Sequence, residues 1–81
     1  MYYTYILETI TNPKRRYIGH TADLRKRLEP HHSGQNRSTA RYRPWKLKLY
    51  LVFESRDLAR GFERYLKSGS GHAFANRHFW C

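Results

Sequence analysis

The segment spanning residues 57–67 has the period of a helix, and it carries a carboxylate inside its apolar stripe. Ala59, Phe62 and Leu66 follow the i, i+3 and i+7 spacing of one buried helix face. Glu63 lies within the same arc. A carboxylate there must be paired, protonated or bound to a metal, because burying it alone costs too much free energy. Two alternatives follow: a nearby arginine pairs with Glu63, or Glu63 holds a divalent cation beside a phosphate-binding surface.

Three further segments have the composition of strands. Residues 2–8 are rich in Tyr, Thr, Ile and Leu, and residues 16–19 form a second short run after the turn signal Asn12-Pro13. These two runs predict a hairpin in which Tyr5 and Tyr17 are cross-strand partners. Residues 46–54 alternate in polarity, as a half-buried strand does. Its apolar positions are expected to share one face of the sheet: Leu47, Leu49, Leu51 and Phe53.

Helices are expected on either side of the third strand. The first runs over about residues 22–31, with Thr21 as its N-cap and Leu24 and Leu28 as its buried edge, and Pro30 ends it or disturbs its last turn. A polar, basic loop covers residues 33–44, and a break of small residues at 68–71 precedes a short final helix. The order β-β-α-β-α, with a final α, predicts an α+β fold. We expect a small three-stranded antiparallel sheet flanked by helices, in a single domain of residues 1–81.

The charge of the chain limits its partners. Sixteen Lys and Arg stand against six Asp and Glu, which gives a formal net charge of +10 and a sequence pI near 10.3. Such a chain favours a polyanion, and nucleic acid is the first candidate because Lys and Arg neutralise phosphates. An anionic membrane surface is the second, but the basic residues do not form one face opposite a Leu, Phe or Trp side. No stretch approaches about 18 apolar residues, so no membrane partner is expected.

Composition also indicates a compartment. Cys81 is the only cysteine and the last residue, so no intramolecular disulfide forms. The N-terminal residues lack the charged start and the long apolar run of a signal peptide. The absence of a disulfide framework favours a reducing compartment, and we expect the cytoplasm.

Several polar side chains are candidates for a site, although each has an ordinary structural interpretation. Tyr5 and Tyr17 could orient a water and a phosphate, but most strand tyrosines are half-buried with hydrated hydroxyls. The planar guanidinium of Arg27 suits phosphate oxygens, but a helix arginine is most often only solvated. His20 and His31 lie near the same basic helix, which alone is only suggestive. The sequence has no Cys/His spacing for zinc and no Walker-type phosphate loop.

The order of the motifs is more specific than any single one. The chain reads Tyr3-Thr4-Tyr5, then Tyr17-Ile18-Gly19, then Arg27, then Arg43-Pro44-Trp45, and then Glu63 on a helix. This order resembles the GIY-YIG nuclease family over essentially the whole chain. It is most similar to small single-domain members related to the N-terminal nuclease domain of UvrC-type excision-repair endonucleases. One departure is that the first motif has neither Gly nor Ile, although its tyrosine is kept.

The resemblance implies a site and a role for each of its members. The implied catalytic residues are Tyr5, Tyr17, His20, Arg27, His31, Glu63 and Asn76. Tyr5 and Tyr17 match the tyrosines of the two motifs, and Tyr17 would be the general base or orient the water. Arg27 would stabilise charge on the scissile phosphate, and Glu63 would bind one divalent ion, Mg²⁺ or Mn²⁺. His20, His31 and Asn76 match further polar positions near the site.

The function implied by the resemblance is that of a metal-dependent endonuclease that hydrolyses phosphodiester bonds in DNA, with structured or damaged DNA and DNA repair as its context. DNA binding is expected on the first helix and the basic loop, through Arg37, Arg41, Arg43 and Lys46. RNA stays open as a substrate, and a monomer is favoured. The alternative is a nucleic-acid-binding module of the same fold without useful catalysis. A third class, a basic protein-interaction domain, would show no salt-sensitive nucleic-acid binding.

Overall fold

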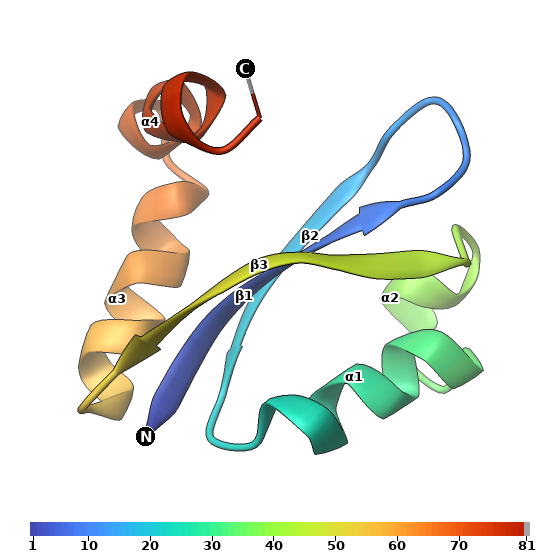
Figure 1. Ribbon diagram of the computed structural model, residues 1–81, viewed down its shortest axis with the longest axis horizontal. Coiled ribbons are helices and arrows are strands. Elements are labelled where there is room, and N and C mark those ends of the chain that lie inside the picture. Colours follow the sequence, from blue (N-terminus) through green and yellow to red (C-terminus); the bar gives the residue numbers. More distant parts are fainter. Residues whose placement is uncertain (81) are drawn as a thin grey trace.

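The computed structural model describes residues 1–80, which form a three-stranded antiparallel sheet with α1 and α2 on one side and α3 and α4 on the other (Figure 1). The elements are β1 (Tyr2–Thr9), β2 (Arg16–Thr21), α1 (Leu24–Ser33), α2 (Arg37–Ala40), β3 (Trp45–Phe53), α3 (Arg56–Leu66) and α4 (Gly69–His78). The predicted α+β class and element order are confirmed, with α2 as an additional short helix inside the basic loop. Cys81 lies outside the described residues. No helix within residues 1–80 is both long and apolar enough to span a bilayer.

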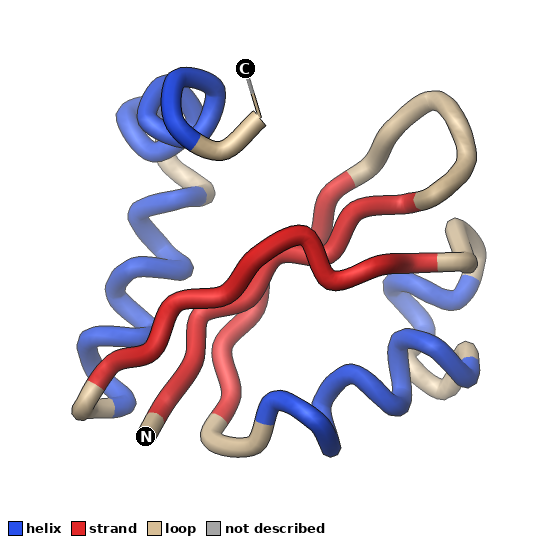
Figure 2. The backbone as a smooth tube through the Cα atoms, viewed as in Figure 1, coloured by secondary structure: helices blue, strands red, loops and turns tan. Residues whose placement is uncertain are grey.

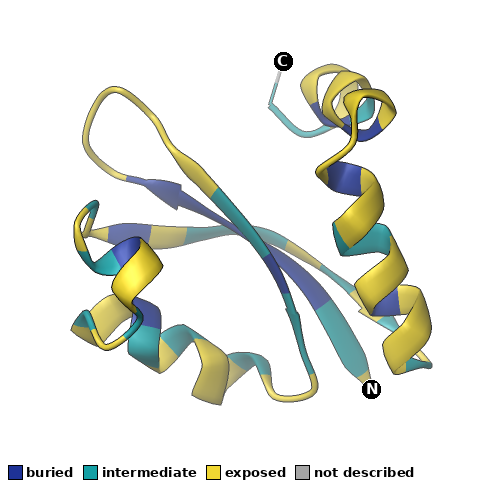
Figure 3. Cartoon of the chain, turned by 180° about the vertical axis from the view of Figure 1, so that it is seen from behind, coloured by how far each residue is buried: buried dark blue, intermediate teal, exposed yellow. Residues whose placement is uncertain are grey.

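Strand β1 is the centre of the sheet, which has the order β2-β1-β3 (Figure 2). Its residues from Thr4 to Thr9 are all buried, because strands cover both of its edges and helices lie on both of its faces (Figure 3). β2 is paired on one side only, and its other edge is open. An open edge strand leaves side chains of both of its faces close to solvent, and the candidate site is built there.

Alternation along β1 divides the core into two clusters. Tyr5 and Leu7 pack with Trp45 on the side of α1 and α2, together with the partly buried Leu24 and Leu28. Leu24 and Leu28 therefore line the core as predicted. Ile6, which points the other way, packs against α3 and α4 in the second cluster.

The second cluster confirms the apolar stripe of α3. Ala59 and Leu66 are buried, and Phe62 packs against Ile6 and Ala75. Gly71 lies where α4 crosses the end of α3, and a Cβ atom there would collide with the carbonyl of Tyr65. The small residues predicted as a break are the N-cap and the first turn of α4. The glycine at position 71 is needed because only a residue without Cβ allows the two helices to cross so closely.

One prediction about β3 is wrong. The register between β1 and β3 shifts by one residue, so that Ile6 pairs with Leu49 and Leu7 pairs with Leu47. Leu47 consequently packs in the cluster of Tyr5, whereas Leu49 packs in the cluster of Ile6. The extra residue of a β-bulge reverses the alternation at this point, and the apolar positions of β3 do not share one face.

The boundaries of α1 also differ from the prediction. Asp23 is the N-cap and accepts a hydrogen bond from the Lys26 backbone N–H, whereas Thr21 accepts one from the Asp23 N–H. The helix does not end at Pro30 but continues to Ser33. Gly34, with φ of 87°, closes it by donating its N–H to the carbonyl of Pro30.

Candidate active site

A chain of hydrogen bonds connects the first-motif tyrosine to α1. The hydroxyl of Tyr5, which is fully buried, lies 3.1 Å from Nε2 of His31. Arg27, one helical turn before His31, donates its Nε–H to the same hydroxyl at 3.3 Å. On the other side of the ring, His31 Nδ1 lies 2.8 Å from the hydroxyl of Thr39 in α2. Three of the predicted site residues are therefore in direct contact.

The partners of His31 assign its protons. The Thr39 hydroxyl donates to the carbonyl of Asn36 at 3.4 Å, so it accepts from His31 Nδ1–H. Nε2 is then the acceptor, and the Tyr5 hydroxyl donates to it. Burial raises the pKa of Tyr5 to about 12, and burial followed by the charges of Arg27 and His32 lowers the pKa of His31. Tyr5 therefore keeps its proton at neutral pH, and His31 stays uncharged.

Tyr17 lies beside this chain on β2. Its ring centroid is 4.6 Å from that of His31 and 6.2 Å from that of Tyr5. The predicted cross-strand pairing of the two tyrosines is wrong, because Tyr5 pairs with Gly19 and Tyr17 pairs with Leu7. The tyrosines nevertheless share one face of the sheet.

Gly19 makes this arrangement sterically feasible. A Cβ atom at Gly19 would lie 2.6 Å from the Tyr5 hydroxyl oxygen, closer than atoms in contact can approach. The glycine of the second motif is thus explained by the space that the tyrosine of the first motif occupies.

The Glu63 carboxylate is paired on the opposite face of β2. His20 Nδ1 lies 2.5 Å from Oε1, and Lys67 Nζ lies 2.7 Å from Oε2. Burial opposes the charge of Glu63, but the hydrogen bonds from Lys67 and His20 outweigh it and lower the pKa of the carboxyl. An ionised carboxylate only accepts, so His20 Nδ1 carries a proton. The partners are a histidine and a lysine, and the arginine alternative is wrong.

Glu63 fits the predicted metal ligand. Among residues 1–80 no group of three or more His, Cys, Asp and Glu side chains is arranged to hold a metal ion. One carboxylate suffices for Mg²⁺, which keeps most of its water ligands. The Lys67 side chain is 55% exposed, so its flexible ammonium group can move into solvent and leave Oε2 to a cation.

Two hollows at the open edge of β2 are each lined by residues from both faces of the sheet. One of about 230 Å³ is lined by His20, Arg27 and Arg56 of α3 among others. A second, of about 370 Å³, is lined by Tyr17, Lys67 and Asn76 among others. Each hollow contains residues from both faces, as the open edge of β2 allows.

Asn76 and the predicted DNA-binding residues are less closely connected to this centre. Asn76 accepts a hydrogen bond from Trp80 Nε1 at 2.9 Å. Arg43 donates to the carbonyls of Ala40 and Ser33, so it ties the two ends of the basic loop together. Arg37 and Arg41 are exposed around α2, and Lys46 lies at the start of β3, close to Glu8. Among the described residues 1–80, no hydrogen bond or ion pair joins the side chains of these cations to the catalytic candidates.

Sequence reasoning missed two residues that hold the site. Lys67 follows Glu63 at the i,i+4 spacing of helical ion pairs, and this signal could have identified it. Thr39 has no such signal, because it meets His31 only when α2 folds against α1. Trp45 fixes α2 by donating its indole N–H to the carbonyl of Thr39 at 2.7 Å.

Comparison with known proteins identifies the family of the chain. The model of the GIY-YIG catalytic domain matches residues 1–76. UPF0213 protein SpyM3_1077 of Streptococcus pyogenes serotype M3 is 41% identical over 66 residues, which cover 80% of this chain and 70% of that relative. UPF0213 protein SpyM50708 of serotype M5 matches with the same identity and coverage. No solved structure matches the chain. The match covers nearly the whole chain, which carries both motif tyrosines, the motif glycine, Arg27 and Glu63, and it shows that the chain belongs to the GIY-YIG family of nuclease-type domains.

Proposed function

We propose that this chain is a divalent-metal-dependent endonuclease that hydrolyses phosphodiester bonds in DNA. The observation that carries the proposal is the ionised carboxylate of Glu63, which is hydrogen-bonded to His20, in a chain of net charge +10. His20 lines one hollow together with the exposed Arg27. A carboxylate beside a phosphate would only weaken simple binding, so its presence favours catalysis over a binding module.

Arg27 is the candidate for stabilising the phosphate in the transition state. Its hydrogen bond to Tyr5 is the main cause that raises the pKa of its guanidinium, which remains charged. Because Tyr5 is buried and also bonded to His31, the Nε end of the guanidinium is fixed while the residue remains exposed. A cation held in place before the reaction stabilises developing negative charge without reorganisation.

Tyr17 is the candidate for orienting or deprotonating the attacking water. The Tyr5 hydroxyl donates a hydrogen bond to His31 and has a pKa of about 12, so Tyr5 is a positioning residue and a poor base. Tyr17 lines the hollow that also contains Lys67, the partner of Glu63. His20 is a second candidate for accepting the proton, since its Nδ1 is bound to Glu63 and its Nε2 has a lone pair in the neutral ring.

Glu63 would hold one Mg²⁺ or Mn²⁺ ion, which supplies Lewis-acid stabilisation of the phosphate and of the leaving oxygen. His20 orients the carboxylate from Oε1, and Lys67 keeps it charged until the cation arrives. Arg37, Arg41, Arg43 and Lys46 would contact the phosphates of flanking DNA.

The test is a panel of labelled substrates incubated with the purified chain in Mg²⁺, Mn²⁺ or EDTA. The panel contains duplex, nicked, branched, damaged and single-stranded DNA, and RNA of the same sequence. Cleavage of at least one DNA in the presence of metal, and none in EDTA, is expected. Salt-sensitive binding without cleavage of any substrate would instead support the binding module.

A further inference from the structure

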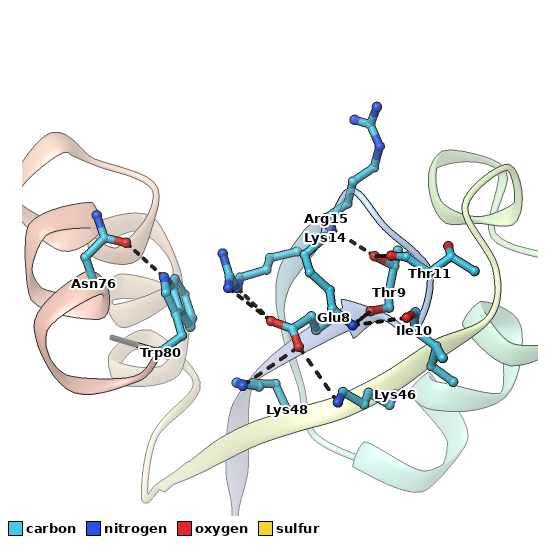
Figure 4. A network of polar contacts seen from close by, with 11 residues as sticks. Glu8, Thr9, Ile10, Thr11, Lys14, Arg15, Lys46, Lys48, Asn76 and Trp80 are labelled. Carbon is cyan, nitrogen blue, oxygen red and sulfur yellow. Dashed lines mark hydrogen bonds and ion pairs between the residues drawn. The ribbon is translucent and has the colours of Figure 1, made fainter.

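A second paired carboxylate, Glu8, is buried and gathers three cations at the far end of the sheet (Figure 4). Glu8 is 4% exposed and lies at the end of β1, next to the start of β3. Arg16 of β2 donates its Nε–H to Oε2 at 3.1 Å, and one of its terminal nitrogens forms an ion pair with the same oxygen at 3.0 Å. Lys46 and Lys48 of β3 approach Oε1 with their Nζ atoms at 3.9 and 3.8 Å. We call these three cations the Glu8 cluster.

The cluster holds more positive charge than Glu8 neutralises. Arg16 alone gives the carboxylate a close, charge-assisted ion pair. The distances of Lys46 and Lys48 exceed the length of a hydrogen bond, so their ammonium groups keep their donors for another acceptor. Three cations around one carboxylate leave two positive charges without a counter-charge inside the cluster.

The cluster is fixed in position by its surroundings. The Arg16 guanidinium stacks on the Trp80 ring, with its central carbon 4.0 Å from the ring centroid. Trp80 in turn is bonded to Asn76 of α4, so the helix and the strand hold this cation between them. The Lys48 side chain is 29% exposed and the Arg16 side chain 31% exposed, which leaves both accessible to a ligand.

A continuous surface leads from the cluster to the proposed active site. Arg16, Trp80, Asn76 and Tyr17 line the same hollow of about 370 Å³. Arg16 and His20 are at opposite ends of β2, about 13 Å apart at the rise of a strand. That distance corresponds to the axial rise of about four base-pair steps of a DNA duplex.

We propose that the Glu8 cluster binds the phosphate backbone of the substrate nucleic acid outside the scissile position, with Glu8 as the buried anion that holds Arg16, Lys46 and Lys48 together. The inference rests on the proposed function and adds Arg16 and Lys48 to its substrate contacts. Phosphodiesters fit the cluster because each brings one negative charge and several acceptor oxygens, which the guanidinium fork and the free ammonium donors can bind.

The experiment compares Lys48→Gln with Arg64→Gln, which removes the same charge from the exposed surface of α3 away from the cluster. Equilibrium binding to a labelled DNA duplex is measured in EDTA over a range of salt concentrations. Lys48→Gln should reduce the slope of log K against log salt by about 0.9, the value for one phosphate contact. At 0.1 M salt this loss corresponds to about eightfold weaker binding. Arg64→Gln should keep the wild-type slope, and Lys48→Arg should restore it.

Thermal unfolding of each variant shows that the comparison is made between folded proteins. Equal slopes for Lys48→Gln and Arg64→Gln would overturn the proposal, because the cluster would then add only to the general charge. Cleavage is assayed separately in Mg²⁺. If the chain cuts no DNA but Lys48→Gln changes the salt slope, the nuclease proposal is contradicted and the phosphate-binding site is supported. If the chain cuts DNA but the slopes of Lys48→Gln and Arg64→Gln are equal, the phosphate-binding site is contradicted and the nuclease proposal is supported.

Discussion

The hydroxyl of Tyr5 lies 3.1 Å from Nε2 of His31, and both side chains are fully buried. This contact joins the central strand to α1 beneath Arg27, whose Nε–H binds the same hydroxyl. The Arg27 guanidinium is therefore held in position by two buried side chains, Tyr5 and His31. Its orientation depends on the packing of the core, and several measurements follow from that dependence.

His31 makes the stability of the protein sensitive to mild acid. Burial, followed by the charges of Arg27 and His32, lowers the pKa of His31, so the unfolded chain takes up the proton more readily. The contribution of the uncharged His31 to the free energy of unfolding is complete above the ordinary histidine pKa of about 6.5. It is lost as the pH falls through the lowered pKa of the folded state. Denaturant unfolding between pH 8 and pH 4 should show a steeper loss for the wild type than for His31→Gln. Parallel profiles for the two proteins would mean that His31 does not carry this effect.

Gly19→Ala should disturb the site through Tyr5. The added Cβ atom would lie 2.6 Å from the hydroxyl oxygen, and overpacking of this kind costs about 1–3 kcal/mol of stability. Displacement of the hydroxyl should also reduce cleavage. Gly61→Ala on the exposed face of α3 is the control, because its Cβ meets nothing within 4 Å. That control should be about 0.5–1 kcal/mol more stable than the wild type, with unchanged cleavage.

Glu63→Gln should abolish cleavage while DNA binding stays intact or becomes slightly tighter. The amide keeps the size of the side chain but removes the charge that a divalent cation requires, and one negative charge near the phosphates is lost. Single-turnover cleavage and binding in EDTA measure the two effects. Asp57→Asn, in the first turn of the same helix, is the matched control and should cut DNA normally. Wild-type cleavage by Glu63→Gln would contradict the metal-ligand assignment.

Arg27→Ala should lower the cleavage rate far more than the affinity. The guanidinium acts most strongly when the phosphate gains negative charge, and the expected loss is about 10²–10³-fold in rate. Arg27→Lys should recover only part of it, since an ammonium group lacks the planar fork and cannot replace the bond from Nε to Tyr5. Equal losses in rate and in binding constant would instead identify Arg27 as an ordinary phosphate contact.

Tyr17→Phe should mainly lower the cleavage rate, whereas Tyr5→Phe should mainly lower the stability of the protein. The hydroxyl of Tyr17 is proposed to act on the water, so its removal should lower cleavage by about 10²–10⁴-fold and change the unfolding temperature little. The hydroxyl of Tyr5 is buried between Arg27 and His31, and its loss leaves His31 Nε2 without a partner, which costs about 1–3 kcal/mol of stability. Its effect on the rate should be smaller. If Tyr17→Phe cuts DNA at the wild-type rate, the proton acceptor must be sought at His20.

Local sequence patterns determined the elements and the identity of the family. The apolar stripe of α3, the alternation of β3 and the hairpin turn each depend on residues that are close in the chain, so period and composition were enough to predict them. Glu63 could be recognised as a carboxylate in need of partners for the same reason. The order of the tyrosines, Arg27 and Glu63 indicated the GIY-YIG family before any contact was known.

The tertiary structure alone decided how these residues meet. His20 reaches Glu63 across the open edge of β2, and Thr39 reaches His31 only because α2 folds onto α1. The bulge in β3 sends Leu47 and Leu49 to different clusters, although the sequence alternates without interruption. Each of these contacts joins separate elements of the fold, and its geometry depends on how those elements are packed. Local propensity carries no information about that packing, and so the partners of Glu63 and the register of β3 could be found only in the folded chain.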